Sequence, residues 1–436
     1  MNMHQIFSLL FVYKFYLIFL WLSETQGKIL GFEKKHVGYK LDQLLVKKNL
    51  FKYVPVMKQE CTKCPRLDPE VNMNVTQLLT SKGYPCEDYT VETKDGFLLS
   101  VQRVAHGLNN KNITNRPVVF LQHGLLCTST NWVTNLINES LAFILADEGY
   151  EVWMGNSRGN TYSRRHRTLS PDQDEFWAWS WDEMGEYDFP AMIDFALNVS
   201  GKTSLYYVGH SQGTTQAFIQ LSQNPEFGEK IKLFFALAPV ATVGSIESPI
   251  RYLSALKDET IYEVLKRRDF LPSNRILDIL ADTVCRSKEL RFLCANVLFL
   301  IAGYDTSNLN NSRLPVYINH TPAGCSVQDL IHYLQGYRSG IFRKYDYGSA
   351  EQNEKYYGQP TPPQYNVSRI TAPVALFYGA NDWLADLKDV ALLIPKIQNL
   401  KAKIEIPQWN HLDFIWGENA ATKVYNTVIQ MIKDNP

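Results

Sequence analysis

The sequence has no excess of charge of either sign. Its 436 residues include 44 Lys and Arg and 44 Asp and Glu, so the formal net charge is zero. A protein that binds nucleic acid through a broad basic field, or that carries an acidic tail, needs one sign of charge to dominate. The composition excludes both, and we expect no nucleic acid among the partners.

The pattern of cysteines and histidines that would bind zinc is also missing. Cys61 and Cys64 form a single Cys-x-x-Cys pair, and no His/Cys cluster follows to complete four ligands. With seven cysteines, at least one thiol stays unpaired. A disulfide that involves Cys61, Cys64 or Cys86 is the simpler interpretation in an oxidising compartment. We expect no metal and no organic cofactor.

Long apolar runs are missing except at the N-terminus. Ile6–Leu22 is interrupted only by Lys14, and polar residues follow it. This predicts a cleaved signal peptide over residues 1–27, with an uncleaved signal anchor as the alternative because no Ala-x-Ala site is present. We therefore expect a secreted, extracellular protein without a stable membrane span after cleavage, and the lysosome is the alternative destination.

Asn-x-Ser/Thr sequons agree with the secretory route. Each is a candidate glycosylation site, and seven together support a chain that enters the lumen. They begin at Asn74, Asn112, Asn138, Asn198, Asn310, Asn319 and Asn366.

A lysine-rich stretch follows the predicted signal peptide. Lys28–Glu60 contains eight Lys against three acidic residues and has no sustained apolar pattern. We interpret residues 28–65 as an N-terminal extension or pro-segment, with a membrane-attracting basic arm as the alternative. Residues 66–436 then form the main domain, and a chain that is 45% hydrophobic can bury a large core.

The first elements of this domain are bounded by turn residues. Asn72–Lys82 predicts a short amphipathic helix that Gly83 ends. Tyr89–Thr93 and Phe97–Gln102 flank an Asp-Gly turn, which is typical of a β-hairpin.

Short apolar runs then alternate with helix-length segments, as in a parallel sheet flanked by helices. A last helix is expected over Asn419–Lys433. We predict an α/β fold with a mostly parallel central sheet. The apolar runs are Pro117–Gln122, Tyr150–Met154, Leu205–Val208, Leu233–Leu237, Val374–Tyr378 and Lys403–Ile406.

The strand pattern lapses between about residues 240 and 366. Helical patterns replace it at Ile250–Leu265, Ile276–Ala281 and Cys294–Ile301. A long helical insertion between strands predicts a cap over one end of the sheet.

Two segments match Gly-x-Ser-x-Gly, the pattern in which a reactive serine lies on a sharp strand-to-helix turn. Glycines flank such a serine because the turn leaves no room for side chains. Gly209–Gly213 lies between an apolar run and an amphipathic helix, one strand beyond the run at 150–154. Gly155–Gly159 is followed by a polar stretch unsuited to a buried helix. We choose Ser211 as the nucleophile and interpret Ser157 as a loop residue.

A serine nucleophile needs a general base, and in this fold the order along the chain is Ser, acid, His. Three histidines follow Ser211. We expect a surface or cap role for His320 and His332, which lie in the insertion. His411 lies in the last loop before the final helix, and we choose it as the base.

The acidic residue that orients the base should lie just after the end of the strand that precedes the last one. Asp382 follows the run at 374–378 directly, and we choose it to orient the base. Asp386 and Asp389 lie further along, where either could cap a helix. Asp413 is too close to His411 in sequence to orient it.

Acyl transfer also requires backbone N–H groups that point at the developing oxyanion. The residue after the nucleophile, Gln212, supplies one. Leu125, in the loop after the run at 117–122, supplies the other, and Gly124 permits the close turn. We expect His123 to be structural.

With these residues in place, the chain resembles the acid lipase family, which includes gastric and lysosomal acid lipases and insect relatives. The resemblance extends from about Asp68 to the C-terminus. The motifs that carry it are Leu121–Leu126 (LQHGLL), Gly155–Asn160 (GNSRGN), Trp181–Asp188 (WDEMGEYD), Gly209–Thr215 (GHSQGTT) and Asn410–Trp416 (NHLDFIW).

The resemblance implies an α/β-hydrolase fold, the triad Ser211, Asp382 and His411, and oxyanion donors at Leu125 and Gln212. It also implies that residues 240–366 form a cap with a mobile lid. A disulfide between Cys285 and Cys294 is implied in the same way. The chain departs from the family in the extension up to residue 64. It departs also in the extra cysteines Cys61, Cys64, Cys86, Cys127 and Cys325.

We expect a secreted serine ester hydrolase that cleaves neutral lipid esters at a lipid–water interface through an acyl-enzyme. The alternatives are a carboxylesterase or thioesterase for smaller esters, and a non-catalytic lipid carrier. The choice between triacylglycerols and cholesteryl esters, the pH optimum and the oligomeric state stay open.

Overall fold

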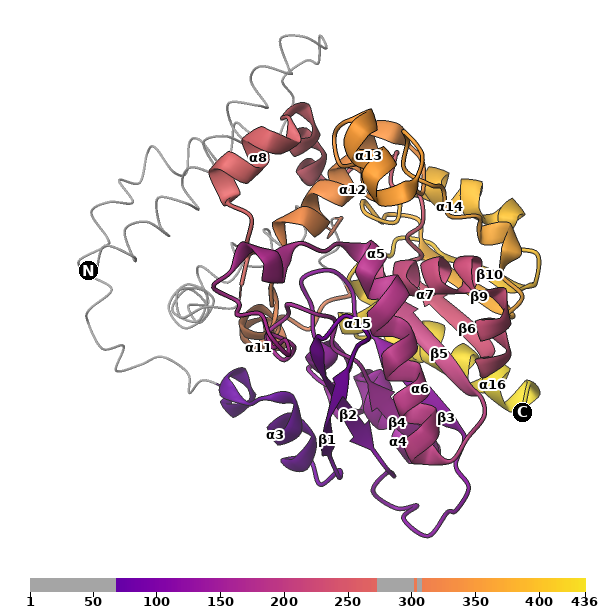
Figure 1. Ribbon diagram of the computed structural model, residues 1–436. Helices are drawn as coiled ribbons and strands as arrows, with labels where there is room; N and C mark the ends of the chain where they lie inside the picture. Colours follow the sequence, from indigo (N-terminus) through magenta and orange to yellow (C-terminus); the bar gives the residue numbers. More distant parts are fainter. Residues whose placement is uncertain (1–67, 273–301, 304–307) are drawn as a thin grey trace, which may run out of the picture. The chain divides into compact units, whose positions relative to one another are not determined.

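The computed structural model describes residues 68–272, 302–303 and 308–436 (Figure 1). The predicted signal peptide (1–27), the extension, the helices expected at 276–281 and 294–301, and the Cys285–Cys294 pair lie outside the described residues.

A mixed eight-stranded sheet in the order β1-β2-β4-β3-β5-β6-β9-β10 forms the core. The first two pairings are antiparallel, and every pairing from β4 to β10 is parallel, which confirms the mostly parallel sheet. The strands are β1 Glu87–Glu92, β2 Leu98–Val104, β3 Val118–Gln122, β4 Glu151–Met154, β5 Leu205–His210, β6 Ile231–Leu237, β9 Val374–Gly379 and β10 Leu400–Ile406.

Burial along the strands explains why continuous apolar runs predict the inner strands. Every residue of β3, β4, β5 and β9 is buried, because helices cover both faces of a parallel sheet. The outer strand β10 instead alternates between half-buried and exposed residues over most of its length. The predicted hairpin is β1–β2, and its turn residue Gly96 has a φ of +96°.

Helices cover both faces of the sheet. Figure 1 shows α6 and α7 in front of the strands and α4 and α16 behind them. The helices outside the cap are α3 Val75–Thr80, α4 Leu141–Asp147, α5 Trp181–Glu183, α6 Phe189–Ser200, α7 Gln212–Gln223, α14 Leu387–Leu393, α15 Asp413–Trp416 and α16 Asn426–Asp434.

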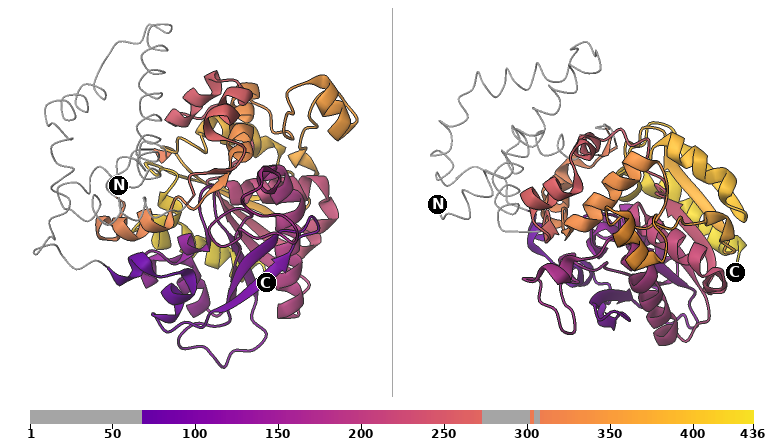
Figure 2. Two further views of the ribbon diagram at one scale, coloured as in Figure 1. Left: turned by 60° about the vertical axis from the view of Figure 1, so that its left-hand side comes forward. Right: turned by 45° about the horizontal axis from the view of Figure 1, so that its top comes forward.

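The described part of the predicted cap is mainly helical. Its helices α8, α12 and α13 gather at one end of the sheet in both views of Figure 2. A short antiparallel pair, β7 with β8, also joins two cap segments, and the helical patterns did not predict it. The cap elements are α8 Asp258–Leu265, α11 Leu314–His320, α12 Val327–Ser339, α13 Ala350–Tyr357, β7 Asp269–Phe270 and β8 Cys325–Ser326.

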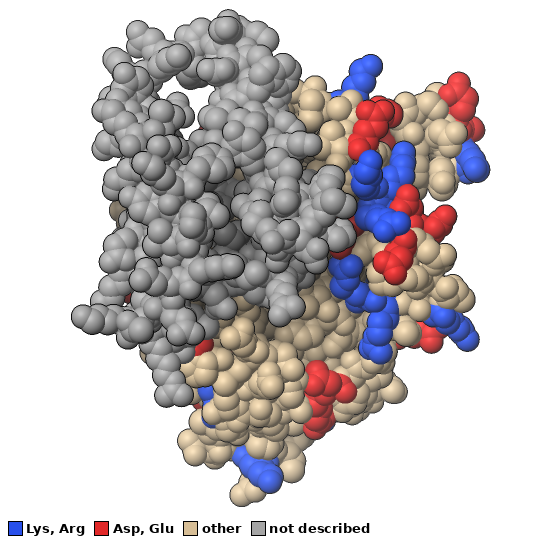
Figure 3. Space-filling view, turned by 90° about the vertical axis from the view of Figure 1, so that its left-hand side faces the viewer, with Lys and Arg blue, Asp and Glu red and all other residues tan. Residues whose placement is uncertain are grey.

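Positive and negative side chains lie among one another on one face of the described residues (Figure 3). On the face shown in Figure 3, the described residues carry Lys and Arg interspersed with Asp and Glu. Within the described ranges, no helix is long and apolar enough to cross a membrane.

Parallel strands bring their carboxyl ends to one edge of the sheet, where ligand sites of α/β folds are built. Strands β3, β5, β9 and β10 are parallel members of this sheet. The loops that follow them, which carry every residue chosen from the sequence for catalysis, therefore start at the same edge.

The first Gly-x-Ser-x-Gly segment contributes a buried ion-pair network. Arg158 is 1% exposed, and its guanidinium lies 2.7 Å from an Asp188 oxygen and 2.6 Å from an Asp95 oxygen. It thereby ties the loop after β4 to the β1–β2 turn and to the N-terminus of α6. The guanidinium also lies over the Phe97 ring.

We expect Arg158→Met to lower the free energy of unfolding by about 3–5 kcal/mol, because it leaves the Asp188 carboxylate buried without a cation. Urea unfolding followed by tryptophan fluorescence measures this. Arg167→Met is the control, since the Arg167–Glu92 pair is exposed and should contribute less than about 1 kcal/mol. Equal losses in the two variants would show that the buried network does not stabilise the fold.

Candidate active site

Ser211 lies on a strained turn between β5 and α7. Its φ of +54° and ψ of −121° are unfavourable for a residue with a side chain. A Cβ at Gly209 would lie 2.8 Å from the Gly213 backbone, and a Cβ at Gly213 would lie 2.4 Å from the Gln122 carbonyl oxygen. The turn therefore requires both glycines, as the sequence pattern predicts.

Backbone and threonine contacts hold this turn in place. The Ser211 N–H donates to the Leu237 carbonyl at 3.0 Å. The Thr214 hydroxyl donates to the Ser211 carbonyl at 2.6 Å and accepts from the Val240 N–H at 2.8 Å. The strain at Ser211 is thus offset by contacts to the neighbouring strand β6 and the segment that follows it.

Ser157 has a different environment from Ser211. It is 2% exposed, and its hydroxyl accepts hydrogen bonds from the Gln122 and Gln216 side-chain amides at 2.9 and 2.8 Å. The hydroxyl contacts no histidine among the described residues. These contacts give Ser157 a structural role in joining β3, the loop after β4 and α7.

The structure brings Asp382 and His411 together. The His411 Nδ1 lies 2.8 Å from Asp382 Oδ2 and 3.0 Å from Oδ1, and both residues are buried. Two backbone N–H groups, from Leu384 and Ala385, donate to Asp382 Oδ1 at 2.8 Å each. The carboxylate is therefore fixed on one side by its own loop and holds the imidazole on the other.

His411 is also placed against the residue that precedes the nucleophile. The His210 Nε2 donates to the His411 carbonyl at 2.9 Å, and the two ring centroids are 4.9 Å apart. Burial and the nearby His411 lower the pKa of His210 well below its usual value, so His210 is a neutral ring. Since Nδ1 of His411 contacts Asp382, its Nε2 is the nitrogen left to act on Ser211.

The two cap histidines make structural contacts within the described residues, and His332 is buried rather than at the surface. His332 Nδ1 lies 2.9 Å from the Ser180 hydroxyl and its Nε2 lies 3.0 Å from the Arg343 carbonyl. Burial lowers the pKa of His332 to about 3. His320 contacts the Glu70 carbonyl.

The other aspartates near the acid serve their own loops. Asp386 caps α14 by accepting from the Lys388 N–H at 2.8 Å, and Asp389 accepts from the Ser245 N–H at 2.8 Å. Asp413 accepts from the Asn410 N–H and from the Asn308 amide.

The loop with Leu125 lies directly against the nucleophile. A Cβ at Gly124 would lie 2.9 Å from the Ser211 Cβ, so only glycine fits there. Leu126 has a φ of +60°, and the Cys127 N–H donates to the Gly124 carbonyl at 3.2 Å, which closes a tight turn around Leu125. No acceptor among the described residues takes the N–H of Leu125 or of Gln212. Both amides are free to bind a developing oxyanion.

His123 orients this loop. The Ser157 N–H and the Asn160 amide lie 3.1 Å from its Nε2, so Nε2 accepts and the proton sits on Nδ1. Nδ1 then donates to the Gly124 carbonyl at 2.8 Å. Burial lowers the pKa of His123 to about 4, consistent with a structural neutral ring.

Sequence reasoning missed one buried contact at this site. The side-chain amide of Gln212 donates to Asp329 Oδ2 at 2.6 Å. Asp329 lies on α12 of the cap, 117 residues further along the chain. No motif spacing connects the two residues, and only the closeness of the cap reveals the pair.

Three cysteines within the described ranges form no disulfide: Cys86, Cys127 and Cys325. The disulfide expected to involve Cys61, Cys64 or Cys86 therefore does not use Cys86, and the other two lie outside the described residues. Burial raises the pKa of Cys127 to about 11, so this thiol beside the oxyanion loop stays protonated.

The sequons differ in their surroundings. Five candidate asparagines are exposed and Asn310 is half-buried; the exposed ones are Asn74, Asn112, Asn138, Asn198 and Asn366. Asn319 is different, because its Nδ2 donates to the Val71 carbonyl and its Oδ1 is buried. The nitrogen that would carry a glycan at Asn319 therefore already donates a hydrogen bond inside the fold.

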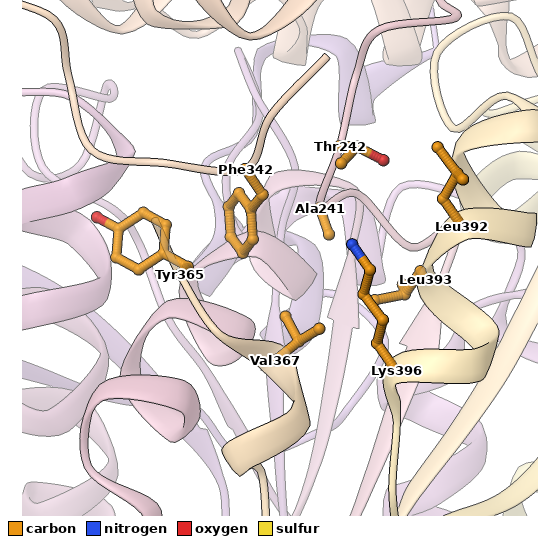
Figure 4. Close-up of a pocket in the computed structure, with 8 residues that line it drawn as sticks. All are labelled: Ala241, Thr242, Phe342, Tyr365, Val367, Leu392, Leu393 and Lys396. Carbon is orange, nitrogen blue, oxygen red and sulfur yellow. The ribbon is translucent and has the colours of Figure 1, made fainter. Parts of the chain in front are cut away.

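A small pocket between the cap and α14 lies apart from these residues. Figure 4 shows the Lys396 side chain reaching across it toward Ala241 and Thr242, with Phe342 and Tyr365 opposite. None of Ser211, Asp382 and His411 lines it. We assign it no part in the chemistry.

Comparisons with known proteins agree with this geometry. The chain matches the family described as "alpha/beta hydrolase fold" over residues 117–418 and the "partial alpha/beta-hydrolase lipase region" over residues 75–136. It is 51% identical to the gastric triacylglycerol lipase of Rattus norvegicus over 369 residues, 84% of this chain and 93% of that protein.

Two human proteins are similarly close. The lysosomal acid lipase/cholesteryl ester hydrolase of Homo sapiens is 50% identical over 372 residues, 85% of this chain and 93% of that protein. The human gastric triacylglycerol lipase is 51% identical over 368 residues, 84% of this chain and 92% of that protein.

We expect Ser211→Ala to lower ester turnover by at least about 10⁴-fold and to abolish labelling by a fluorophosphonate, because the attacking oxygen is gone. Ser157→Ala should still be labelled. It should lose only about 1–3 kcal/mol of stability, since two buried amide donors lose their acceptor. Labelling of Ser211→Ala, or its loss in folded Ser157→Ala, would contradict the choice of nucleophile.

Asp382→Asn should lower kcat by about 10⁴-fold, because the amide cannot accept from His411 Nδ1–H and stabilises the wrong tautomer. Turnover of a soluble ester measures it, with circular dichroism as the check on folding. Asp386→Asn is the matched control, since the asparagine can still cap α14. If Asp386→Asn lowers kcat as much as Asp382→Asn does, Asp382 is not the residue that orients His411.

Proposed function

This chain belongs to the acid lipase family of α/β-hydrolases, and we propose that it hydrolyses neutral lipid esters, such as triacylglycerols or cholesteryl esters, to free fatty acids. The observation that carries the proposal is the strained serine turn at Ser211. Ser211 follows His210, which contacts His411 of the buried Asp382–His411 pair, and the chain is 50–51% identical to lipases over 84–85% of its length.

In the first half-reaction, His411 Nε2 takes the proton from the Ser211 hydroxyl as the oxygen attacks the ester carbonyl. The tetrahedral intermediate carries a negative oxygen, which the N–H groups of Leu125 and Gln212 stabilise. The intermediate collapses when the carbon–oxygen bond to the alcohol breaks and His411 returns its proton to the leaving alcohol.

In the second half-reaction, a water molecule replaces the alcohol. His411 removes a proton from the water, which attacks the acyl carbonyl and passes through the same oxyanion site. Collapse releases the fatty acid and restores the Ser211 hydroxyl. Asp382 holds the imidazole in the productive tautomer and stabilises its positive charge in both halves.

The proposed substrate class rests on two supports. Two relatives at 50–51% identity are named gastric triacylglycerol lipase and lysosomal acid lipase/cholesteryl ester hydrolase. The α8–α12–α13 cap gathers at one end of the sheet, where it can cover the acyl chain of a bound ester.

We also propose that the protein follows the secretory route, to the extracellular space or to the lysosome. The apolar N-terminal stretch and the exposed sequons support this route. Relatives with a gastric and with a lysosomal name are 51% and 50% identical to this chain over 84% and 85% of its length.

We expect the enzyme to release fatty acid from emulsified trioleoylglycerol or cholesteryl oleate at least about tenfold faster than from a soluble acetate ester. Product analysis at several pH values measures both rates, and Ser211→Ala is the control for background hydrolysis. Faster turnover of the acetate would identify a carboxylesterase instead. Saturable lipid binding without fatty acid release would identify a carrier.

A further inference from the structure

A hydrogen bond joins the cap to the side chain of one proposed oxyanion donor, Gln212. Gln212 is the first residue of α7, and its side-chain amide donates to Asp329 Oδ2 on α12 at 2.6 Å. Gln212 is 2% exposed and Asp329 is fully buried, so water does not compete for this contact.

We propose that Asp329 is a positioning residue that fixes Gln212 so that its backbone N–H points at the oxyanion. The inference rests on the proposed function, because it assigns a role to a group outside the triad in that same reaction. A side chain held at its far end restricts rotation of its own peptide group, and oxyanion stabilisation depends on donors that are oriented before the reaction.

Asp329 lies on a part of the cap that is held against the main domain. Ser326 caps α12 by accepting from the Asp329 N–H at 2.9 Å, and its hydroxyl donates to the Trp179 carbonyl at 2.5 Å. One turn further along α12, the His332 ring packs on Trp181 with centroids 4.0 Å apart. This part of α12 is therefore anchored to the main domain.

The groups that face Asp329 are acidic or neutral. Asp182 and Glu183 approach it from α5, Tyr333 lies one turn along its own helix, and Cys325 lies just before that helix. Burial raises the pKa of Asp182 to about 6 and that of Glu183 to about 7. The pKa values of Tyr333 and Cys325 are raised well above their usual range by burial.

Two cations, Lys344 and Arg158, affect the pKa values of the acidic residues beside Asp329. Lys344 lowers the pKa of Asp182, and Arg158 lowers that of Glu183, but burial outweighs both. Burial likewise raises the pKa of Asp329 to about 7, with the Gln212 hydrogen bond working in the opposite direction.

The sign of the pH dependence follows from this. Below about pH 7, Asp329 is a neutral acid whose carbonyl oxygen can accept from Gln212. Above it, Asp329 carries a negative charge close to the oxyanion, which that charge destabilises. We therefore expect kcat to fall as pH rises through this pKa.

The test is the pH profile of kcat on a soluble ester for two variants, with active sites counted by fluorophosphonate titration. Asp329→Leu removes the acceptor and should lower kcat about tenfold while KM changes less than about twofold. Asp329→Asn keeps a carbonyl acceptor but cannot ionise. It should restore the lost kcat and move the alkaline limb upward by about one pH unit or more.

Asp258→Asn is the matched control. Asp258 accepts from the Gln335 amide on α12 at 2.8 Å, so it makes the same type of contact away from Ser211. Its pH profile should match that of the unmodified enzyme. Gln212→Met removes the other half of the proposed pair, and its loss in kcat should not add to that of Asp329→Leu in the double variant.

An alkaline limb that is the same in Asp329→Asn and the unmodified enzyme, or additive losses in the double variant, overturns the positioning role. The proposed function is tested separately in the unmodified enzyme. If it neither reacts with the fluorophosphonate nor hydrolyses esters, both proposals fail. If it does both while the Asp329 variants behave like Asp258→Asn, only the positioning role fails. Should Asp329→Leu not fold, Asp329→Asn and Gln212→Met still decide it.

Discussion

The strained turn at Ser211 is the constraint on which the site depends. A serine at a φ of +54° persists only where the surroundings compensate the strain. Gly209 and Gly213 let strand and helix approach within contact distances that no side chain would allow. The Thr214 hydroxyl and the Leu237 carbonyl then bond the turn to β6 and the segment after it. The Ser211 hydroxyl thereby lies at the carboxyl end of the central strand β5, at the edge of the sheet where three other loops begin.

The parallel sheet supplies what the turn alone cannot. Strands β3, β9 and β10 end at the same edge as β5, so Leu125, Asp382 and His411 arrive from segments up to 286 residues apart. The Asp382–His411 contact is short because backbone amides hold the carboxylate and His210 holds the His411 backbone. These contacts fix the Asp382 carboxylate and the His411 ring, and they leave His411 Nε2 available to take the Ser211 proton.

The two Gly-x-Ser-x-Gly segments show how similar patterns acquire different roles. Both follow buried strands, yet Ser157 is bonded by two glutamines and its neighbour Arg158 joins buried Asp188 and Asp95. That segment stiffens the base of the site and aligns His123, which in turn donates to the Gly124 carbonyl. The cap adds a further restraint through Asp329.

Local pattern in the sequence determined the strands, the hairpin and the choice of Ser211 over Ser157, because periodicity, glycine and turn chemistry act between neighbours. The order of Ser, acid and His along the chain, together with the place of each candidate after a predicted strand, selected Asp382 and His411. Tertiary structure alone decided the β7–β8 pair, the packing of Asn319 and the Gln212–Asp329 bond. These depend on segments that are distant in sequence and meet only when the apolar core closes, and no local spacing records them.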